Sequence, residues 1–159
     1  MKAKAIAVVC LLAIGLTGCG EKKQQVAGSQ WQVTNVYTTP EFPNEVPDAI
    51  AGSVMMSFGD SSMTGFTGCA PFQGKVSFSA EGKQDVAPQD ADRLTVQAVK
   101  FQPIDDATCE GRTRYIHDSL VNIIVDASFN VRHDSPDVMT LLRSGDSVDA
   151  PAIRLVVKH

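Results

Sequence analysis

The chain has 159 residues, of which 43% are hydrophobic and 20% charged, and its formal net charge is -4. This length fits one globular domain, and the apolar content is too high for a disordered chain. The acidic balance disfavours nucleic acid as a partner, because phosphates are bound by clustered Lys and Arg. The composition therefore predicts a small globular protein that binds no nucleic acid.

The first eighteen residues have the features of an export signal. Lys2 and Lys4 form a short basic start, and residues 5–14 are an unbroken apolar run. Ten residues in a helix cover about 15 Å, roughly half the thickness of a bilayer core. The run is therefore too short for a membrane-spanning anchor, and a cleaved signal is expected.

The signal ends in Leu16-Thr17-Gly18-Cys19. This ending resembles the bacterial lipobox, in which Leu and two small residues precede a Cys that receives a diacylglyceryl group before cleavage. The resemblance implies that residues 1–18 are a lipoprotein signal peptide and that Cys19 carries the lipid, with palmitate among its acyl chains. A plain secretory signal with an incidental Cys19 is the alternative. Two or three chains are needed for lasting attachment, because one chain binds a membrane only marginally.

Residues 19–29 are polar and small, and they show no periodicity. They predict a flexible tether that keeps the domain, residues 30–159, at the extracytoplasmic face of the cell membrane. Without Lys2 and Lys4 the mature chain would carry 12 basic and 18 acidic side chains. The membrane, reached through the lipid, is the expected partner, with another envelope protein as a candidate second partner.

Two cysteines, Cys69 and Cys109, belong to the expected mature domain. In an oxidising compartment such a pair usually forms a disulfide. Closing a 40-residue separation would stabilise the fold by about 4 kcal/mol. The alternative is a redox-active or metal-binding pair, but there is no CxxC, and His117, His133 and His159 are not spaced as ligands. The sequence therefore predicts a structural disulfide, with no metal and no cofactor.

Most of the domain predicts β-strands, because apolar residues alternate between turn-forming segments. The expected strands are residues 31–37, 53–58, 63–67, 75–79, 93–102, 129–133, 138–143 and 153–158. Three of them have inward faces that alternation defines, namely Trp31, Val33 and Tyr37, then Val54, Met56 and Phe58, then Leu94, Val96 and Ala98. Residues 39–52 contain three prolines and predict an irregular connection.

One segment, residues 110–125, has helical periodicity instead. Ile116, Leu120, Ile123 and Ile124 form its apolar stripe. Thr108 is the expected N-cap, with Glu110 in the first turn. The stripe needs a partner, so the fold class is α+β and mainly antiparallel β: a curved sheet or partial barrel packed against one α-helix. Cys109 would join the start of this helix to the loop that contains Cys69.

Residues 65–76, GFTGCAPFQGKV, resemble the signature of the META/HslJ-like domain family, Gly-x-x-Gly-Cys-Asn-x-Phe/Tyr-x-Gly-x-Tyr. The order of the other predicted elements agrees, from the Trp31 strand to the last hairpin, so the resemblance covers residues 30–159. It implies a small β-rich exported domain, in some members linked to stress or antibiotic tolerance, with no known catalytic activity. Ala70 stands where the family has Asn, so any role of that Asn is not carried over.

Three glycines in this segment, Gly65, Gly68 and Gly74, predict backbone that turns sharply or packs closely. A phosphate-binding loop is the alternative, but it would need a helix with a Lys or Ser/Thr at its start. No such pattern follows Gly74.

The sequence leaves three functional hypotheses. The first is a non-catalytic envelope protein that binds a partner or supports envelope integrity and stress tolerance. The second is an enzyme using His117, His133, or the pair Asp105 and Asp106. No Gly-x-Ser-x-Gly elbow is present, and a helix flank, a charged hairpin and helix capping explain these residues without catalysis. The third is a carrier of an apolar ligand or lipid in a β-sheet pocket. The residues that would line such a pocket, if they do not fill the core, are Phe58, Phe66, Phe72, Phe78 and Phe101.

Overall fold

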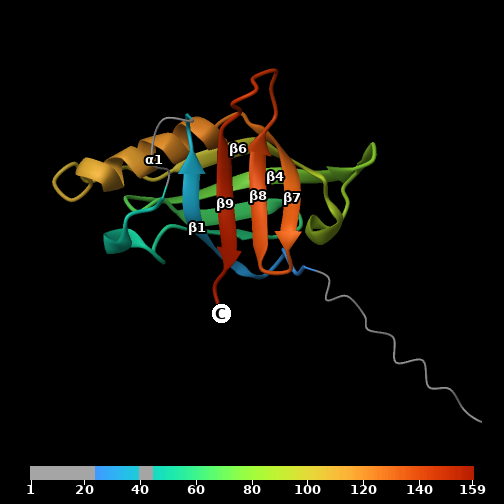
Figure 1. Ribbon diagram of the computed structural model, residues 1–159, viewed down its shortest axis with the longest axis horizontal. Helices are drawn as coiled ribbons and strands as arrows, with labels where there is room; N and C mark the ends of the chain where they lie inside the picture. The colour runs from blue at the N-terminus through green and yellow to red at the C-terminus, as the bar shows by residue number, and fades with distance from the viewer. Residues whose placement is uncertain (1–23, 40–44) are drawn as a thin grey trace, which may run out of the picture.

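The computed structural model describes residues 24–39 and 45–159, and these form an antiparallel β-barrel with one α-helix (Figure 1). The strands pair in the order β3-β2-β1-β9-β8-β7-β6-β4, and β3 also pairs with β4. The short β5 pairs only with the end of β4. The strands are β1 (Gln30–Tyr37), β2 (Met55–Phe58), β3 (Ser62–Phe66), β4 (Pro71–Ala80), β5 (Lys83–Gln84), β6 (Arg93–Phe101), β7 (Ser128–Ser135), β8 (Val138–Arg143) and β9 (Ala152–Val157).

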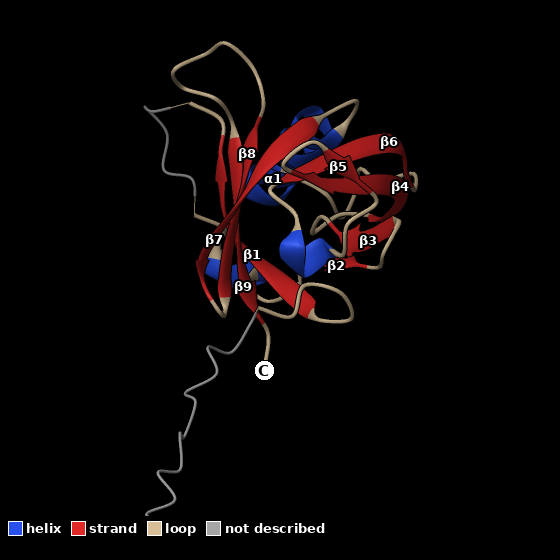
Figure 2. Ribbon diagram, turned by 90° about the vertical axis from the view of Figure 1, so that its right-hand side faces the viewer, coloured by secondary structure: helices blue, strands red, loops and turns tan. Residues whose placement is uncertain are grey.

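The mainly antiparallel α+β class is confirmed, but the expectation of a partial barrel is wrong. The pairing of β3 with β4, from Ser62 opposite Lys75 to Phe66 opposite Pro71, closes eight strands into a complete barrel. Closure leaves no free edge between β3 and β4, where a curved open sheet would have one. Figure 2 shows the two walls of the barrel, with β1, β9, β8 and β7 in one and β2, β3, β4 and β6 in the other.

Alternating side chains fill the barrel interior, as the sequence pattern predicts. Val54, just before β2, and Met56 and Phe58 within it are all buried. Trp31 and Val33 on β1 are completely buried. The core also takes in the largest fully buried side chains of the other strands and the helix, among them Phe78, Leu94, Phe129, Met139, Leu141 and Ile153.

Two β-bulges overturn two predicted inward positions. In β1 the register shifts between Val33 and Asn35, so Val36 is buried and Tyr37 is 38% exposed. In β6, Val96 faces Val76 and Ala98 faces Lys75, which leaves Gln97 as the extra residue and turns Ala98 outward. A bulge places two residues opposite one, so every later side chain changes face.

The three glycines of residues 65–76 do turn sharply or pack closely. Gly68 has a φ of 95° and makes the turn between β3 and β4. A Cβ on Gly65 would lie 2.5 Å from Cζ of Phe72, and one on Gly74 would lie 2.7 Å from the carbonyl oxygen of Ala98. Only glycine fits where adjacent strands approach so closely.

The helix α1 (Gly111–Ile124) lies along one rim of the barrel, at the upper left of Figure 1. The predicted stripe of Ile116, Leu120, Ile123 and Ile124 is buried and belongs to the barrel core. Thr108 is not the N-cap, because the helix begins after Glu110 in an extended conformation. The backbone N–H and the side-chain hydroxyl of Thr108 instead donate to the carbonyl oxygen of Asp105.

Two of the predicted segments lie wholly or partly outside the described residues. The proposed signal peptide and Cys19 precede Gln24, where the description starts. The connection before β2 is described from Glu45 onward and contains a short 3-10 helix, η1 (Asp48–Ile50). Within the described residues, no helix is long and apolar enough to cross a membrane.

Candidate functional site

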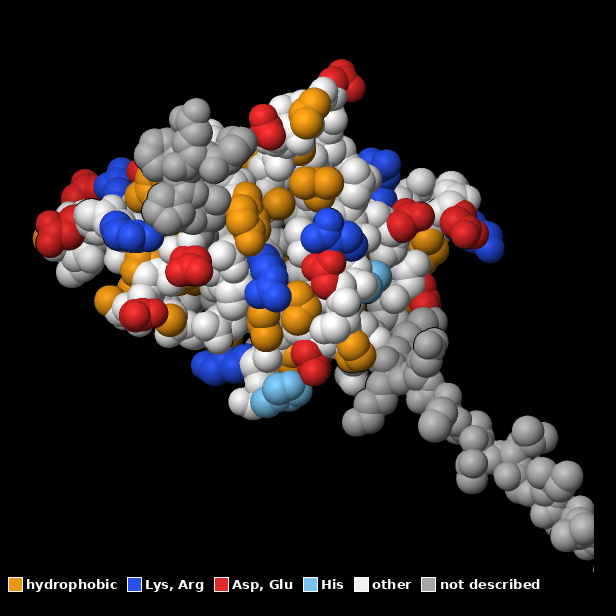
Figure 3. Space-filling view, in the orientation of Figure 1, with side chains coloured by type: hydrophobic (Ala, Val, Ile, Leu, Met, Phe, Trp, Pro, Cys, Tyr) orange, Lys and Arg blue, Asp and Glu red, His pale blue; other side chains and the backbone are white. Residues whose placement is uncertain are grey.

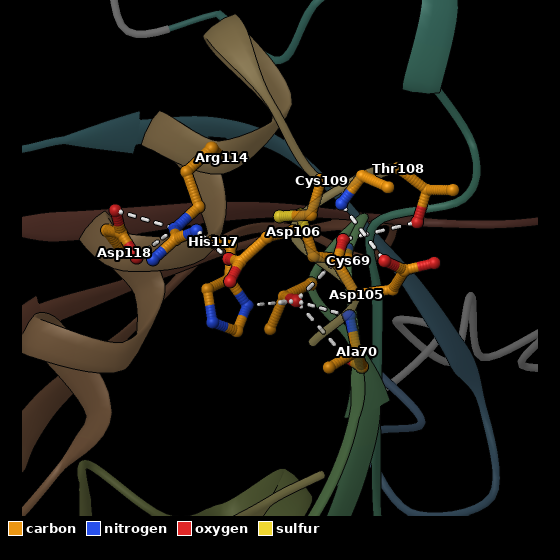
Figure 4. The surroundings of a disulfide bond; sticks show 11 residues. Cys69, Ala70, Asp105, Asp106, Thr108, Cys109, Arg114, His117 and Asp118 are labelled. Carbon is orange, nitrogen blue, oxygen red and sulfur yellow. Dashed lines mark hydrogen bonds and ion pairs between the residues drawn. A yellow bond between two sulfur atoms is a disulfide. The ribbon is translucent and has the colours of Figure 1, made fainter. Parts of the chain in front are cut away.

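The predicted disulfide between Cys69 and Cys109 is present, with the two Cα atoms 5.3 Å apart (Figure 4). Cys69 lies in the β3–β4 loop, and Cys109 lies two residues before α1. The bond therefore joins the start of the helix to the glycine-rich loop, as the sequence predicts. This loop, with the first turns of α1, forms the helix end of the barrel.

A buried hydrogen-bond network around Thr67 holds the backbone of the same loop. The hydroxyl oxygen of Thr67 accepts the backbone N–H groups of Cys69 at 3.3 Å and Ala70 at 3.1 Å. The same hydroxyl lies 3.1 Å from the carbonyl oxygen of Ala70, to which it can donate, and 2.7 Å from Nδ1 of His117. Thr67 and Ala70 are both fully buried. The side chain of Thr67 thus fixes the backbone of this loop. The side chain of Ala70 has no polar group that could do so.

His117 is buried beneath the disulfide loop rather than placed at the exposed helix flank that the sequence predicts. Only 7% of the residue is exposed, and its ring packs edge-on against Phe101. Burial lowers the pKa of His117 below its ordinary value, because a charged ring loses its hydration; Asp118 opposes this shift and Arg114 adds to it. The lowered pKa favours the neutral imidazole.

Asp105 and Asp106 have structural partners at the entrance to α1. The side chain of Asp105 accepts the backbone N–H of Ala107, which closes the turn before Cys109. Asp106 pairs with Arg114 at 2.8 Å, and the same guanidinium contacts Asp118 at 3.1 Å. These bonds to Asp118 and Asp106 raise the pKa of Arg114. The two acids therefore organise a turn and an ion pair, and they do not face each other as paired catalytic carboxyls.

The opposite end of the barrel holds His133, in contact with a residue that the sequence assigned to the tether. Nδ1 of His133 contacts the side-chain oxygen of Gln24, and Nε2 lies 3.2 Å from the carbonyl oxygen of Ala91. The side-chain amide of Gln24 donates to the carbonyl oxygens of Ser135 at 2.8 Å and Val138 at 3.2 Å. Gln24 is only 7% exposed.

Residues 24–29 are thus packed against the barrel, and the prediction that they form a flexible tether is wrong. Val26 is 1% exposed and belongs to the core, and its carbonyl oxygen accepts the indole N–H of Trp31. Ala27 bridges to Phe58, and the N–H of Gly28 donates to the carbonyl oxygen of Phe58. A polar composition concealed this docking, because the sequence does not reveal which carbonyl groups a glutamine will reach.

The phenylalanines that a carrier would use to line a pocket mostly pack against one another. Phe58 and Phe78 meet edge-to-face with their centroids 6.3 Å apart, and Phe72 and Phe101 lie 5.2 Å apart. Phe66 is 36% exposed at the end of β3 and lies outside the core. These contacts are those of a filled interior.

A shallow groove of about 520 Å³ lies on the outer surface of β3, β4 and β6. Its polar lining includes Lys75, Lys100, Thr64 and Gln73. Its apolar lining includes Met63, which belongs to the core cluster, and Val99, which packs against it. The opposite wall, formed by β1, β9, β8 and β7, carries basic and acidic side chains interspersed with hydrophobic ones (Figure 3).

In the part of the chain that the structure describes, no three His, Cys, Asp or Glu side chains gather as metal ligands. Among the predicted site residues, Cys69 and Cys109 are joined, while Cys19 lies outside the described residues. Sequence reasoning missed Thr67, Gln24 and the buried position of His117. The chain matches no protein-family model, no curated protein and no solved structure.

Proposed function

We propose that this chain is a lipid-anchored extracytoplasmic envelope protein without catalytic activity, which supports envelope integrity and stress tolerance by binding another envelope component. The observation that carries the proposal is the position of Cys19. It ends an apolar export-like segment with the spacing of a lipobox, and it lies only five positions before Gln24, which is buried against the barrel.

The bonds of the two candidate catalytic histidines support the non-catalytic part of the proposal. Nδ1 of His117 is hydrogen-bonded to a fully buried threonine whose oxygen also accepts two backbone N–H groups. His133 contacts Gln24 and the carbonyl oxygen of Ala91. A general base needs a partner that substrate can reach, and the Thr67 hydroxyl is completely buried.

The contacts among the phenylalanines favour this proposal over a carrier of an apolar ligand. Three of the five, Phe58, Phe72 and Phe78, are buried in the core cluster and contact other aromatic rings there. A carrier needs an interior cavity of a few hundred Å³ lined by such rings. Rings that pack against each other at centroid distances of 5.2 and 6.3 Å leave that volume to side chains.

Metabolic labelling with an alkynyl fatty acid tests the anchor. The native chain, expressed in a bacterium, is expected to take up the label and to sediment with membranes. Cys19→Ala should lose the label, whereas Cys10→Ala should keep it, because Cys10 precedes the proposed cleavage site. An unlabelled native chain that is released into the medium would contradict the proposal.

Complementation tests the envelope role. Cells that lack the chain are expected to be more sensitive to a membrane-perturbing detergent, and the native gene should restore resistance. Cys19→Ala should not restore it, whereas His133→Gln should, because no chemistry is assigned to that ring. Full restoration of resistance by Cys19→Ala would show that the envelope role does not need the lipid anchor, and this would contradict the proposal.

A further inference from the structure

The described chain starts at one end of the barrel, and α1 covers the other. Gln24 contacts the β7–β8 turn through the carbonyl oxygens of Ser135 and Val138. This turn lies at the bottom of Figure 1, together with the C-terminus, whereas α1 lies at the top. We call the first the turn end, defined by residues 24–29, the β7–β8 turn and the β2–β3 turn.

The segment that reaches the turn end is held at several points. The amide of Gln24 makes two hydrogen bonds to backbone carbonyls, and the side chain of Val26 is inserted into the core. Ala27 and Gly28 then pair with the end of β2 at Phe58. Because these contacts come from three separate segments of the barrel, the direction in which the chain leaves the barrel is fixed at Gln24.

The remaining link to the proposed lipid is short. Four residues lie between Cys19 and Gln24, so five Cα–Cα steps join them, and these span at most about 18 Å when fully extended. β7 has eight residues, and at a typical strand tilt of about 40° it rises about 20 Å along the barrel axis; α1 lies at the far rim, so the link is shorter than the distance from the turn end to the helix end. The chain therefore cannot bring the helix end to the membrane while Gln24 remains docked.

We propose that the turn end of the barrel faces the lipid surface in a fixed orientation and that the helix end, with its disulfide, faces away from it. The proposal rests on the proposed lipidation of Cys19. It commits the turn end to one partner, the bilayer to which the lipid belongs.

This orientation turns a set of exposed apolar side chains away from the bilayer. Among the described residues, the exposed large hydrophobic side chains all lie at strand termini, loops or α1 of the helix end; they are Tyr37, Phe66, Tyr115, Val125, Leu142 and Val148. They would face the aqueous compartment, where another envelope protein can reach them.

Energy transfer to a membrane-confined acceptor tests the orientation with the lipidated full chain in phospholipid vesicles. A fluorophore is attached to a cysteine introduced at the turn end, Pro136→Cys, or at the helix end, Ser147→Cys, while the native disulfide stays oxidised. Both positions are exposed. Transfer from position 136 is expected to be at least about twofold more efficient than from position 147, since about 20 Å along the barrel axis separates the ends.

Two variants show whether the short link and the docking cause the difference. Twelve Gly/Ser residues inserted between Lys23 and Gln24 should bring the two efficiencies together. Gln24→Ala should reduce the difference, whereas Gln25→Ala, at an exposed neighbouring position, should keep it. Equal transfer from both labels on a natively linked, lipidated chain would overturn the orientation and leave lipidation intact. A chain that carries no fatty acid would overturn the proposed function itself, and the orientation with it.

Discussion

At the scale of single residues, the best-defined polar group of the helix end is the hydroxyl of Thr67. It holds two backbone N–H groups of the disulfide loop and one ring nitrogen of α1, so one oxygen links β3, the loop and the helix. Buried polar groups cost stability when they lose their partners. Loss of this hydroxyl is therefore expected to destabilise the contact between the disulfide loop and α1.

Replacement of this hydroxyl by a methyl group, in Thr67→Val, keeps the shape and leaves two buried N–H groups unpaired. The free energy of unfolding is expected to fall by about 1–3 kcal/mol. Urea unfolding of the oxidised protein measures it. The control Thr64→Val changes an exposed residue of β3, the strand that ends just before Thr67, and should stay within about 0.5 kcal/mol of the native value. Equal effects of the two substitutions would contradict the role of the Thr67 network.

The buried His117 makes stability depend on pH. Its pKa is lowered by burial in the folded state, whereas in the unfolded chain it takes up a proton near its ordinary value of about 6.5. Between that value and the lowered pKa of the folded state the unfolded state binds more protons, so stability should fall as the pH is lowered from about 7 through 6.5 and below. His117→Asn, which retains a hydrogen-bonding partner for Thr67 but does not titrate, should show a shallower fall in urea midpoint as the pH is lowered through this range. Parallel profiles for the two proteins would contradict this assignment.

At the scale of elements, the close approach of neighbouring strands depends on glycine. A Cβ on Gly65 would meet the ring of Phe72, and one on Gly74 would meet the backbone of β6. These contacts explain why the glycine-rich segment forms strands and a turn and does not form a ligand-binding loop.

Gly65→Ala should therefore destabilise the barrel by about 1–3 kcal/mol, because the added methyl group would meet both the backbone carbonyl oxygen of Met55 and the Phe72 ring in a packed core. Thermal unfolding gives the change in stability. Gly145→Ala is the matched control, since nothing lies within 4 Å of a Cβ at that loop position, and it should be nearly neutral. A Gly65→Ala protein as stable as the control would contradict the prediction that the close contacts at Gly65 require glycine.

The elements also show how far the sequence could be interpreted. Alternation correctly predicted Val54, Met56 and Phe58 as buried, and helical periodicity predicted the stripe from Ile116 to Ile124. It failed at Tyr37 and Ala98, because each follows a bulge, and a bulge is set by the partner strand. Gln24 was missed for a related reason, since its hydrogen-bond partners lie more than a hundred residues away in the chain.

At the scale of the whole molecule, the disulfide and the barrel closure act on the same region. The bond closes a 40-residue separation that contains all of β4, β5 and β6. The disulfide therefore reduces the conformational entropy of the unfolded chain in the segment that contains β4, the strand that pairs with β3 and closes the barrel.

The double variant Cys69→Ala, Cys109→Ala is expected to lose about 4 kcal/mol of stability in the chain-entropy estimate. Guanidinium unfolding with and without a reductant measures the loss. The reductant should lower the native midpoint toward that of the variant and leave the variant itself unchanged. A native protein that carries two alkylatable thiols, or one whose midpoint ignores the reductant, would contradict the structural role of the bond.

The pairing of β1 with β9 has a consequence for how the protein is made. The first and last strands lie side by side, from Trp31 opposite Val157 to Tyr37 opposite Ala152. A ribosome-bound chain that ends before residue 152 thus lacks the neighbour of β1 and cannot complete the sheet. Such a high contact order slows folding, so the barrel stays incomplete until residues 152–157 have left the ribosome.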